Sequence, residues 1–451
     1  MRFPIVVLFI LGLACPFLML AQPQAASSAQ DVQVLTLEDA VSLALRSNRL
    51  VKNADLEAKK FDSRVATART RRLPNMQVAV LGGELLQPFD YTFKKGTFGT
   101  YSNTGPIPGS DTKVHNPANF TAYITGGIHE PLLQQYKIGL GIRATEIGRQ
   151  IAREDVRAER MRIAAEVRNA YFDLVATQAG VDAAREQVKT LKEAQRVTTE
   201  YRTQEAVLRA DALDVDARLA KSVYDLSVAE NGLATEREHL NQLLGRDLTT
   251  DFRVVDTPED NAPDLNLASA RQQALESRPE IRQAHLKQKQ AEYDRRIAKA
   301  EYIPDLSLSV QYLGLQNVEV LPANVAVAGF LFTWEPFDWG RKRNNVAEKT
   351  RTVEQARNGA QETESQIAVE VGAKYRKWQE ASLLLKASRI TQQASAEKLR
   401  VTGTKYKEQA ALIKDLLQAH AQSTEADYQY QRALSSYWSA FAELRRAMGE
   451  E

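Results

Sequence analysis

The chain has 451 residues, 43% of them hydrophobic and 26% charged, which are the fractions of an ordinary soluble globular protein. Its formal net charge at pH 7 is only +2, and no dense block of lysine and arginine interleaved with aromatic residues occurs. Composition therefore argues against nucleic acid as a partner and leaves the fold class open.

The N-terminus has the form of a secretory signal peptide. One positive charge at Arg2 precedes an apolar run over residues 3–20, and small residues follow it. We expect residues 1–21 to be removed, with cleavage within 21–26, and the mature chain to start with a linker that ends at residue 34.

The only cysteine, Cys15, lies inside this leader. The processed chain would then contain no disulfide and no thiol. Attachment of a lipid at Cys15 is the alternative. Gly12, where such signals prefer leucine, and the adjacent Pro16 disfavour it.

The segment that follows is duplicated: residues 35–80 match residues 265–310 without a gap. The residues that the two copies share are Leu35, Leu37, Ala44, Leu45 and Pro74 and, in the same order, Leu265, Leu267, Ala274, Leu275 and Pro304. A period this long indicates duplicated halves. We divide the chain into two structural repeats, 35–248 and 265–449, with residues 249–264 as the linker.

Each repeat opens with a helix. In the first repeat Thr36 and Asp39 have the spacing of a capping box, and the apolar pattern predicts one helix as far as about Arg72. Leu73 and Pro74 end this helix, because a proline disfavours helical geometry in the residue before it. The alternation of apolar and polar residues beyond them predicts a strand.

A strand hairpin follows in each repeat, over about residues 75–131 and 304–336. In the second hairpin the apolar residues Leu306, Leu308, Val310 and Tyr312 alternate with Ser307, Ser309 and Gln311. We expect the partner strands at 120–130 and 325–335. Residues 87–119, rich in glycine, proline, serine, threonine and asparagine, are expected to form a long outer loop that shields the mouth or binds something outside.

Long proline-free stretches come next, over about 142–245 and 343–449, and each predicts a pair of helices. The first helix, ending near Glu200, would be roughly 90 Å long at about 1.5 Å per residue. Leu219, Leu226, Leu233 and Leu240 recur every seven residues in the returning helix, as do Ser423, Tyr430, Tyr437 and Leu444 in the second repeat. This period indicates coiled-coil packing, and the polar remaining faces favour a hydrated tube of helices.

The number of strands suggests how the chain assembles. Four strands of about ten residues have transmembrane length, but a closed outer-membrane barrel needs at least about eight. Three copies would supply twelve strands. We therefore expect a homotrimer, mainly α with a small membrane β part, in which long helical hairpins form an α-barrel that continues into a 12-stranded β-barrel.

The chain resembles the TolC family of outer-membrane efflux proteins over essentially its whole mature length. The segments that carry the resemblance are Leu35-Thr36-Leu37-Glu38-Asp39-Ala40-Val41 with Ala44, Leu45 and Asn48, its second copy Leu265-Asn266-Leu267 with Ala274 and Leu275, the junction Trp334-Glu335-Pro336-Phe337-Asp338-Trp339-Gly340-Arg341, and the helix-pair endings Leu243-Leu244-Gly245 and Ala447-Met448-Gly449.

The resemblance implies a trimeric channel in the bacterial outer membrane that extends into the periplasm. It also implies docking to a periplasmic adaptor and an inner-membrane pump that provides the energy. The channel itself would be passive and would serve tripartite efflux or type I secretion. The sequence does not identify the cargo.

Members of this family close the channel near the periplasmic turns between helices. The resemblance therefore makes Asp211, Asp214 and Asp415 candidates for a ring of carboxylates at the aperture. Gln418 stands where a further acid often occurs. The alternative is that these aspartates only stabilise the positive end of a helix.

The same turns are the candidate docking sites for the adaptor. They contain Tyr201 with Gln204 and Tyr406 with Gln409. The glutamines replace the glycine that commonly follows the tyrosine by three residues in the family. Docking to a standard adaptor is therefore in question.

Trp334 and Trp339 flank the junction after the last strand and are candidates for an aromatic belt at the membrane interface. Packing inside the protein is the alternative. Arg341, Lys342 and Arg343, just beyond, either contact water or touch lipid headgroups.

No motif indicates catalysis or a cofactor. The five histidines are scattered without the spacing of metal ligands, and no phosphate loop or nucleophile elbow occurs. We expect no metal, no cofactor and no enzymatic activity. A periplasmic adaptor or another structural coiled-coil interaction protein is the alternative function, but adaptors have one helical hairpin and soluble β domains.

Overall fold

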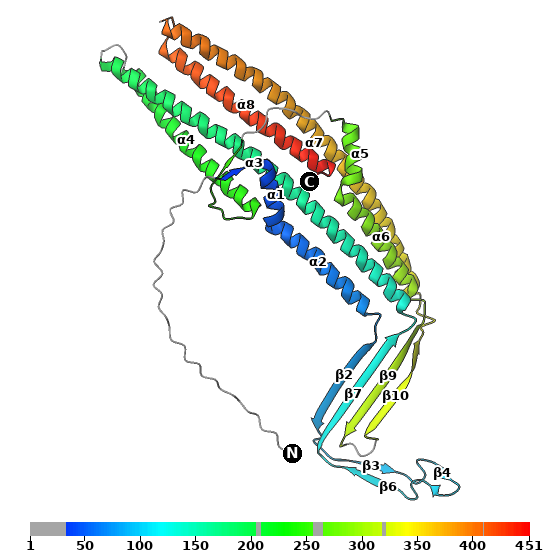
Figure 1. The fold of residues 1–451 in the computed structure, drawn as a ribbon. Coiled ribbons are helices and arrows are strands. Elements are labelled where there is room, and N and C mark those ends of the chain that lie inside the picture. Colours follow the sequence, from blue (N-terminus) through cyan, green and yellow to red (C-terminus); the bar gives the residue numbers. More distant parts are fainter. Residues whose placement is uncertain (1–32, 204–208, 256–264, 318–321, 409) are drawn as a thin grey trace, which may run out of the picture.

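The molecule is elongated, with long helices that lead at one end into a single sheet (Figure 1). The computed structural model describes residues 33–203, 209–255, 265–317, 322–408 and 410–451. The expected signal peptide, residues 1–21, lies outside this part of the chain.

The elements recur in the same order in the two repeats. The helices are α1 Leu37–Ser47, α2 Arg49–Thr70, α3 Gln135–Thr203, α4 Arg209–Leu244, α5 Leu267–Ser277, α6 Pro279–Ala300, α7 Arg341–Lys407 and α8 Ile413–Met448. The strands are β1 Gln33–Leu35, β2 Asn75–Glu84, β3 Phe89–Phe93, β4 Thr100–Tyr101, β5 Gly105–Pro106, β6 Thr112–Asn116, β7 Phe120–Pro131, β8 Phe252–Val254, β9 Asp305–Gln316 and β10 Asn324–Thr333.

The helices form a layer in which α3 is central. It packs against α2 and α4 of its own repeat and against α6 and α8 of the other, while α7 lies beyond α6 and α8 (Figure 1). Both α3, with 69 residues, and α7, with 67, run nearly the full length of the helical part. The predicted long helical pairs are confirmed, and α3 begins earlier than expected, at Gln135.

The predicted single helix as far as Arg72 is wrong, because the chain breaks at Asn48 into α1 and α2. The Asn48 side-chain oxygen accepts hydrogen bonds from two backbone N–H groups in the first turn of α2, at 2.8 and 3.4 Å. Its Nδ2 donates to the Leu243 carbonyl oxygen at the end of α4, at 2.8 Å. In the second repeat Arg278 occupies the same place, and Pro279 begins α6.

Residues 87–119 are not the loop that we expected. They contain an antiparallel hairpin of β3 and β6, continued by the short pair β4 and β5. Aromatic residues hold it together: the Tyr91 and Phe93 rings lie 5.9 Å apart, and the Phe93 and Phe98 rings 5.2 Å apart. The turn-rich composition conceals these short strands from a pattern search.

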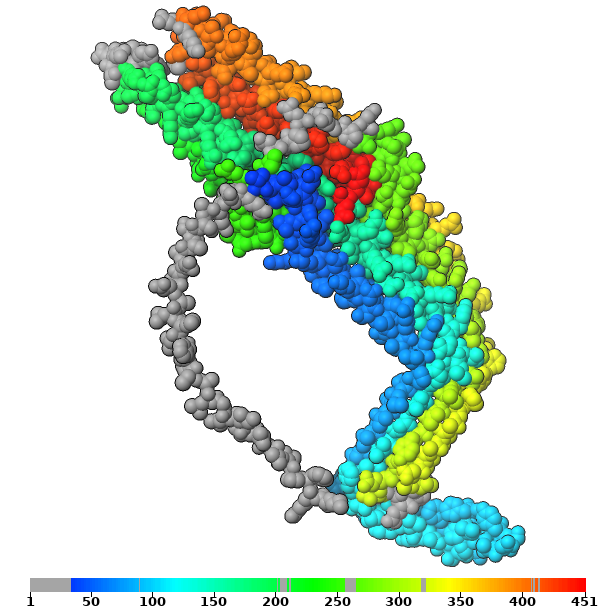
Figure 2. Space-filling model, viewed as in Figure 1, coloured from blue at the N-terminus to red at the C-terminus, as the bar shows by residue number. Residues whose placement is uncertain are grey.

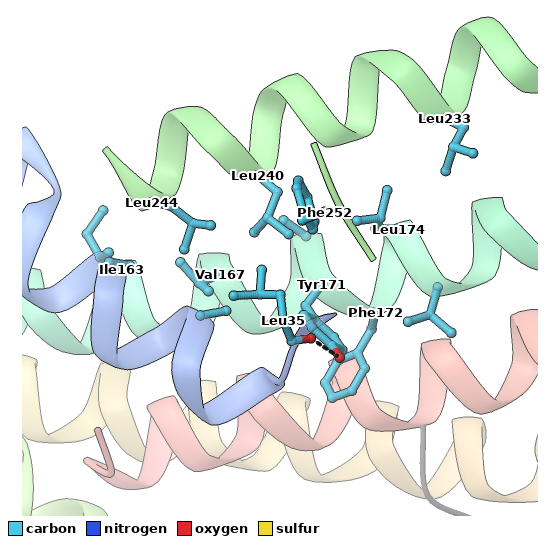
Figure 3. Packing of buried hydrophobic residues seen from close by; sticks show 14 of the residues in the cluster. Leu35, Ile163, Val167, Tyr171, Phe172, Leu174, Leu233, Leu240, Leu244 and Phe252 are labelled. Atoms are coloured by element: carbon cyan, nitrogen blue, oxygen red, sulfur yellow. Dashed lines mark hydrogen bonds between the residues drawn. The ribbon is translucent and has the colours of Figure 1, made fainter. Parts of the chain in front are cut away.

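Two equivalent apolar cores hold the helices together. In the first, residues of α1, α3 and α4 surround Tyr171, whose hydroxyl donates to the Leu35 carbonyl oxygen at 3.1 Å (Figure 3). In the second, the Tyr375 hydroxyl donates to the Leu265 carbonyl oxygen at 2.9 Å. Trp438 connects the two cores. The duplication is therefore retained down to single hydrogen bonds.

The heptad pattern is confirmed, and burial increases along it. Leu240 and Leu444 are fully buried, whereas Leu219 and Leu226 near the other end of α4 are only partly buried. The heptad positions of α4 are thus tightly packed near its C-terminal end and more open toward its start, whereas those of α8 are buried throughout.

Two glycines end the returning helices in the left-handed conformation, Gly245 with φ 68° and Gly449 with φ 90°. A Cβ atom on Gly245 would lie 2.6 Å from the Ser47 carbonyl oxygen, and one on Gly449 would lie 2.8 Å from the Ser277 Cβ atom. Only glycine fits these positions, since a side chain would meet both strain and a clash.

A short parallel pair of strands, β1 and β8, was not expected from the sequence. It joins Gln33–Leu35 to Phe252–Val254, two segments next to the expected linkers. The Tyr171 hydroxyl fixes this pair, because it accepts from the Val255 N–H at 3.0 Å and also binds Leu35. No apolar periodicity marks strands of three residues.

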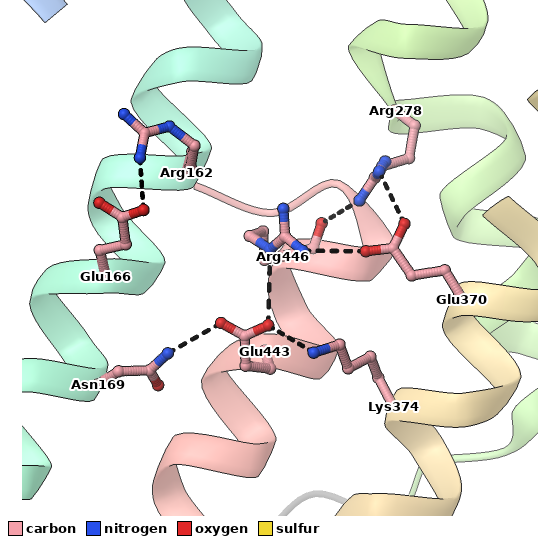
Figure 4. Close-up of polar contacts among 8 residues, drawn as sticks. All are labelled: Arg162, Glu166, Asn169, Arg278, Glu370, Lys374, Glu443 and Arg446. Carbon is pink, nitrogen blue, oxygen red and sulfur yellow. Dashed lines mark hydrogen bonds and ion pairs between the residues drawn. The ribbon is translucent and has the colours of Figure 1, made fainter. Parts of the chain in front are cut away.

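A network of charged side chains lies between the helices of the second repeat (Figure 4). Arg278, only 4% exposed, donates to the Glu370 carboxylate at 3.0 Å and to the Arg446 carbonyl oxygen at 3.1 Å. Arg446 donates to the other Glu370 oxygen at 3.0 Å. These contacts connect the start of α6 with α7 and α8.

Glu443 extends the network toward the first repeat. Its carboxylate accepts from Lys374 of α7 at 2.8 Å and from Asn169 of α3 at 2.9 Å (Figure 4). Burial raises the pKa of Glu443, but the hydrogen bonds from Lys374 and Asn169 and the nearby charges outweigh it, so this pKa lies below its usual value.

Candidate functional site

The four long strands form one antiparallel sheet in the order β10-β9-β7-β2. The two predicted hairpins are confirmed, and the pairing of β7 with β9, which joins the two repeats, is additional. The last strand ends at Thr333, two residues before the expected end. Within the described residues β2 and β10 each pair on one side only, so the sheet has two open edges.

The sheet has one strongly apolar face. Residues directly opposite each other in an antiparallel pair project to the same side. The register therefore gathers on one face Met76, Val78, Val80, Ala122, Ile124, Ile128, Leu306, Leu308, Val310, Tyr312, Ala326, Ala328, Phe330 and Phe332. The opposite face is mixed: it includes Gln77, Thr125, His129, Ser307, Ser309, Gln311 and Thr333, most of them toward the helices, and also Leu81, Leu313, Val327 and Leu331.

No part of the described chain covers the apolar face. Val78 is 66% exposed and Phe330 is 72% exposed. Contiguous exposed apolar surface of this kind marks a site of contact with a membrane or another protein. The small polar residues on the other face fit the wall of a hydrated passage.

Aromatic residues gather at the junction between the sheet and the helices. Trp334 directly follows the end of β10 at Thr333 and is 58% exposed. Phe337 and Trp339 form an edge-to-face pair with ring centroids 4.9 Å apart, and Trp339 is 89% exposed with φ 57°. Neither Trp334 nor Trp339 is packed in the interior of this chain.

The three basic residues after this junction have different surroundings. Arg341 pairs with the Glu335 carboxylate at 2.5 Å. Lys342 is buried and donates to the Glu335 carbonyl oxygen at 2.7 Å. Arg343 is exposed and has no ion pair within the described chain. Only Arg343 is thus available to an outside group as a free cation.

At the opposite end of the molecule, Asp415 lies in the first turn of α8. Its carboxylate accepts a hydrogen bond from the Leu412 backbone N–H at 3.2 Å, which satisfies one of the free donors at the helix start. The side chain remains exposed. Helix capping is therefore one role of Asp415. Because the carboxylate is exposed, it can also interact with ions in solution.

Asp211 and Asp214 lie in the first two turns of α4, which begins at Arg209. The Asp214 carboxylate pairs with Arg218 at 2.8 Å, and both side chains are exposed. The structure does not describe the side chain of Asp211. Of the three candidate acids, Asp214 therefore already has a partner cation in its own chain.

The candidate docking residues lie at the same end. Tyr201 is near the end of α3 and Tyr406 near the end of α7, whereas Gln204 and Gln409 lie outside the described residues. Gln418, exposed on α8, contributes to a groove between the two helical hairpins.

This groove, which we call the inter-hairpin groove, has a volume of about 1160 Å³. It is lined mainly by small and uncharged residues of α3, α4, α7 and α8, among them Gly180, Ala184, Gly232, Ala387 and Ala421. Such a lining allows close approach of another helix. The turns could be named as docking candidates from the sequence, but this groove could not, because its residues come from four helices.

Two further searches of the described residues were negative. They contain no group of three or more histidine, cysteine or acidic side chains that could hold a metal ion. No helix among them combines the length and the apolar character that a membrane crossing needs.

Comparison with protein families gives one match. Residues 270–450 match the family described as outer membrane efflux protein. This match covers the second repeat and confirms the resemblance to the TolC family. Comparison with curated proteins gives no match.

Solved structures of two outer-membrane channels and of one further outer-membrane protein have the same fold. The CmeC channel of Campylobacter jejuni matches with a TM-score of 0.74 and 17% identity, over 92% of this chain and 85% of that one. The MtrE channel of Neisseria gonorrhoeae matches with a TM-score of 0.69 and 18% identity, over 92% and 89%. VceC of Vibrio cholerae matches with a TM-score of 0.69 and 16% identity, over 92% and 96%.

Proposed function

We propose that this chain, whose residues 270–450 belong to the outer membrane efflux protein family, forms a trimeric channel through the outer membrane. The observation that carries the proposal is the sheet: four strands of 10 to 12 residues with one apolar face and two open edges. Unpaired backbone groups cannot face lipid, so such a sheet must close with other copies.

Three copies give a barrel of twelve strands. In it β10 of one copy pairs with β2 of the next, and the apolar face turns outward to the lipid. Trp334 and Trp339 then lie at the periplasmic interface, where amphipathic aromatic rings are favoured. The long helices extend from the barrel into the periplasm and form an α-barrel there.

The channel is passive and serves as the exit duct of an efflux or secretion system. A passage lined by polar faces lets solutes leave without crossing lipid, while an inner-membrane pump supplies the energy. A periplasmic adaptor docks at the end of the helical hairpins, and the inter-hairpin groove fits a helix of that adaptor. The matched family is one of channels, and we propose no catalytic step.

The aperture of the channel lies at the tips of the helical hairpins. Three copies of Asp415 form a ring there, to which Asp211 contributes, and a ring of carboxylates selects for cations. Asp214 contributes less, because Arg218 already neutralises it.

The test is single-channel conductance of the purified protein in a planar bilayer, with its mass in detergent measured in parallel. We expect a trimer with stable conductance steps. Asp415→Asn keeps the side chain as a hydrogen-bond acceptor for the helix start, removes its charge and lowers the preference for cations. Asp214→Asn is the matched control, for which we expect a smaller change.

A monomeric protein without conductance would refute the proposal and favour the periplasmic adaptor. Conductance steps whose ion preference does not change in Asp415→Asn would keep the channel and remove the acidic aperture.

A further inference from the structure

We infer that the β3–β6 hairpin is an arm that docks onto a second copy of this chain; the inference depends on the trimer proposed above. We use the term outer arm for residues 89–116, which contain β3, β4, β5 and β6. The outer arm is absent from the second repeat, in which β9 and β10 are separated by only a few residues.

The outer arm has one aromatic face. The register places Tyr91 opposite Val114 and Phe93 opposite Thr112, so these side chains project to the same side. Phe98 packs on Phe93 beyond the last of these pairs. Tyr91 and Phe98 are both more than half exposed. This face therefore has apolar surface that the chain itself leaves uncovered.

The other face of the outer arm is polar and internally paired. Asp90 lies opposite His115, and its carboxylate is 2.6 Å from His115 Nδ1 and 3.3 Å from Lys113 Nζ. Thr92, opposite Lys113, completes this face. The two faces thus differ in the way that a strand pair does when one side packs on protein and the other meets water.

An isolated strand pair of this length is marginal in water. The outer arm contains only five paired positions in β3 and β6. Packing of its aromatic face against another surface would stabilise it, and the nearest surface after closure of the barrel belongs to another copy.

The direction of the outer arm identifies that copy. It leaves the ends of β2 and β7 and, in the view of Figures 1 and 2, runs across the far end of the sheet to beyond β10. The open edge of β10 is the one that β2 of the next copy would pair with. In this view (Figure 1) the arm therefore extends to the β10 side of the sheet, on which the neighbour would lie.

The neighbour presents a complementary surface there. The start of β10 and the end of β2 lie at the same end of the sheet, so pairing brings Glu84 and Leu86 of the next copy close to the arm. Leu86 is 90% exposed. Glu84 is exposed and has no ion pair within the described chain, and neither do Lys94 and Lys95 on the arm.

Apolar contact with Leu86 and attraction between the lysines and Glu84 both favour this docking. The outer arm would then clamp each copy to the next on the outside of the membrane. Residues 89–116 thus contribute to the stability of the trimer and leave the passage open.

Cross-linking of two tagged chains tests the docking. The chain has one cysteine, Cys15, within the expected signal peptide, and with Cys15 replaced by serine the introduced thiols give an unambiguous signal. One chain carries Val114→Cys on the aromatic face, and a second chain with another tag carries Leu86→Cys. After co-expression and oxidation we expect disulfides that join the two tags. Lys113→Cys, one residue away on the polar face, is the matched control and should give at least ten-fold less.

Reaction with a small thiol reagent normalises the accessibility of the two positions. A cross-link that is equal for both faces, or absent in a protein that is trimeric and conducts ions, would contradict the docking of the arm but leave the proposed channel intact. Cross-links formed by Val114→Cys with itself would instead place the three arms over the mouth and would also overturn the docking. A protein that forms no trimer at all would overturn both proposals.

A second variant measures the stability of the trimer. Replacement of Tyr91, Phe93 and Phe98 by serine should lower the temperature at which the trimer dissociates in detergent by several degrees, with conductance retained. The control replaces Thr92 and Lys113 by serine on the polar face and should leave this temperature unchanged. Equal effects of the two variants would contradict a docked aromatic face.

Discussion

The two structural repeats share their packing but differ in the polar groups that fix it. Tyr171 and Tyr375 donate to equivalent carbonyl oxygens, and Gly245 and Gly449 end equivalent helices against equivalent serines. At the break between the first two helices, however, the first repeat has the neutral Asn48 and the second has the charged Arg278.

The difference shows which constraints the duplicated fold imposes. Both side chains reach the carbonyl end of the returning helix, Asn48 at Leu243 and Arg278 at Arg446, so a donor is needed at this position. The charge is an addition. The buried Arg278 pairs through it with the partly exposed Glu370, which also pairs with Arg446.

The largest loss of stability is expected when the charged side chain of Arg278 is removed. Arg278→Met removes the hydrogen bonds to the Glu370 carboxylate and to the Arg446 carbonyl oxygen at a partly buried place and should lower the free energy of unfolding by about 3–4 kcal/mol. Asn48→Ala, its counterpart, loses a helix cap and one hydrogen bond and should cost about 1–2 kcal/mol. Chemical denaturation in detergent, followed by circular dichroism, measures both. Equal losses would mean that the charge adds nothing.

The glycines test the feature that the repeats share. Gly245→Ala and Gly449→Ala each add a Cβ atom to a residue in the left-handed conformation, close to Ser47 and Ser277 respectively. Each should lower the free energy of unfolding by about 2–4 kcal/mol. Gly232→Ala is the control, because it lies within α4 with no atom within 4 Å of the added Cβ and should be neutral or stabilising. Thermal unfolding compares the three variants. If Gly449→Ala kept its stability while Gly245→Ala lost it, the two positions would not be equivalent.

The hydrogen bonds of the two tyrosine hydroxyls also differ between the repeats, with a smaller expected difference in unfolding free energy. Tyr171 contacts Leu35 and both backbone groups of Val255, whereas Tyr375 contacts the Leu265 carbonyl oxygen. Tyr171→Phe should therefore cost about 1–2 kcal/mol and Tyr375→Phe about 1 kcal/mol, measured by the same denaturation. Hydrogen exchange at β1 and β8 should rise in Tyr171→Phe only. If exchange there does not change, the hydroxyl does not hold the strand pair.

The smallest effect concerns pH. The pKa of Glu443 is lowered from an ordinary value of 4.5, so its ionised form stabilises the fold above that pH, and this contribution is lost as the pH falls through the lowered value. We expect Glu443→Gln to unfold with a weaker dependence on pH below about 4.5 than the unmodified protein. Thermal midpoints between pH 3 and pH 7 measure it. Parallel curves for the two proteins would show that Glu443 is not linked to folding.

The elements that could be predicted from the sequence are those whose residue pattern extends over many positions. The duplication, the proline-free helices and the alternating strands at 304–316 each extend over many residues, and the structure confirms the elements. The break at Asn48 was not predicted, because apolar residues continue through it with helical spacing. The β7–β9 pairing joins the repeats and has no local signal.

The candidate site was predictable only in part. The sequence placed Trp334 and Trp339 near a strand end and Asp415 near a helix start, and both positions are confirmed. It could not predict that Asp415 binds the Leu412 N–H or that Arg218 pairs with Asp214, because such contacts depend on side-chain direction. The aromatic face of the outer arm depends on the register of five paired positions within residues 87–119.

The account depends most on closure of the sheet between copies. Its most direct measurement is a disulfide scan in membranes, with Val78→Cys in β2 combined with single cysteines along β10. We predict covalent trimers whose cross-link has one maximum, at the β10 position directly opposite Val78, on the face that contains Ala326, Ala328, Phe330 and Phe332. Chains that remain monomeric throughout the scan, or a cross-link of equal strength along β10, would contradict the pairing of β2 with β10.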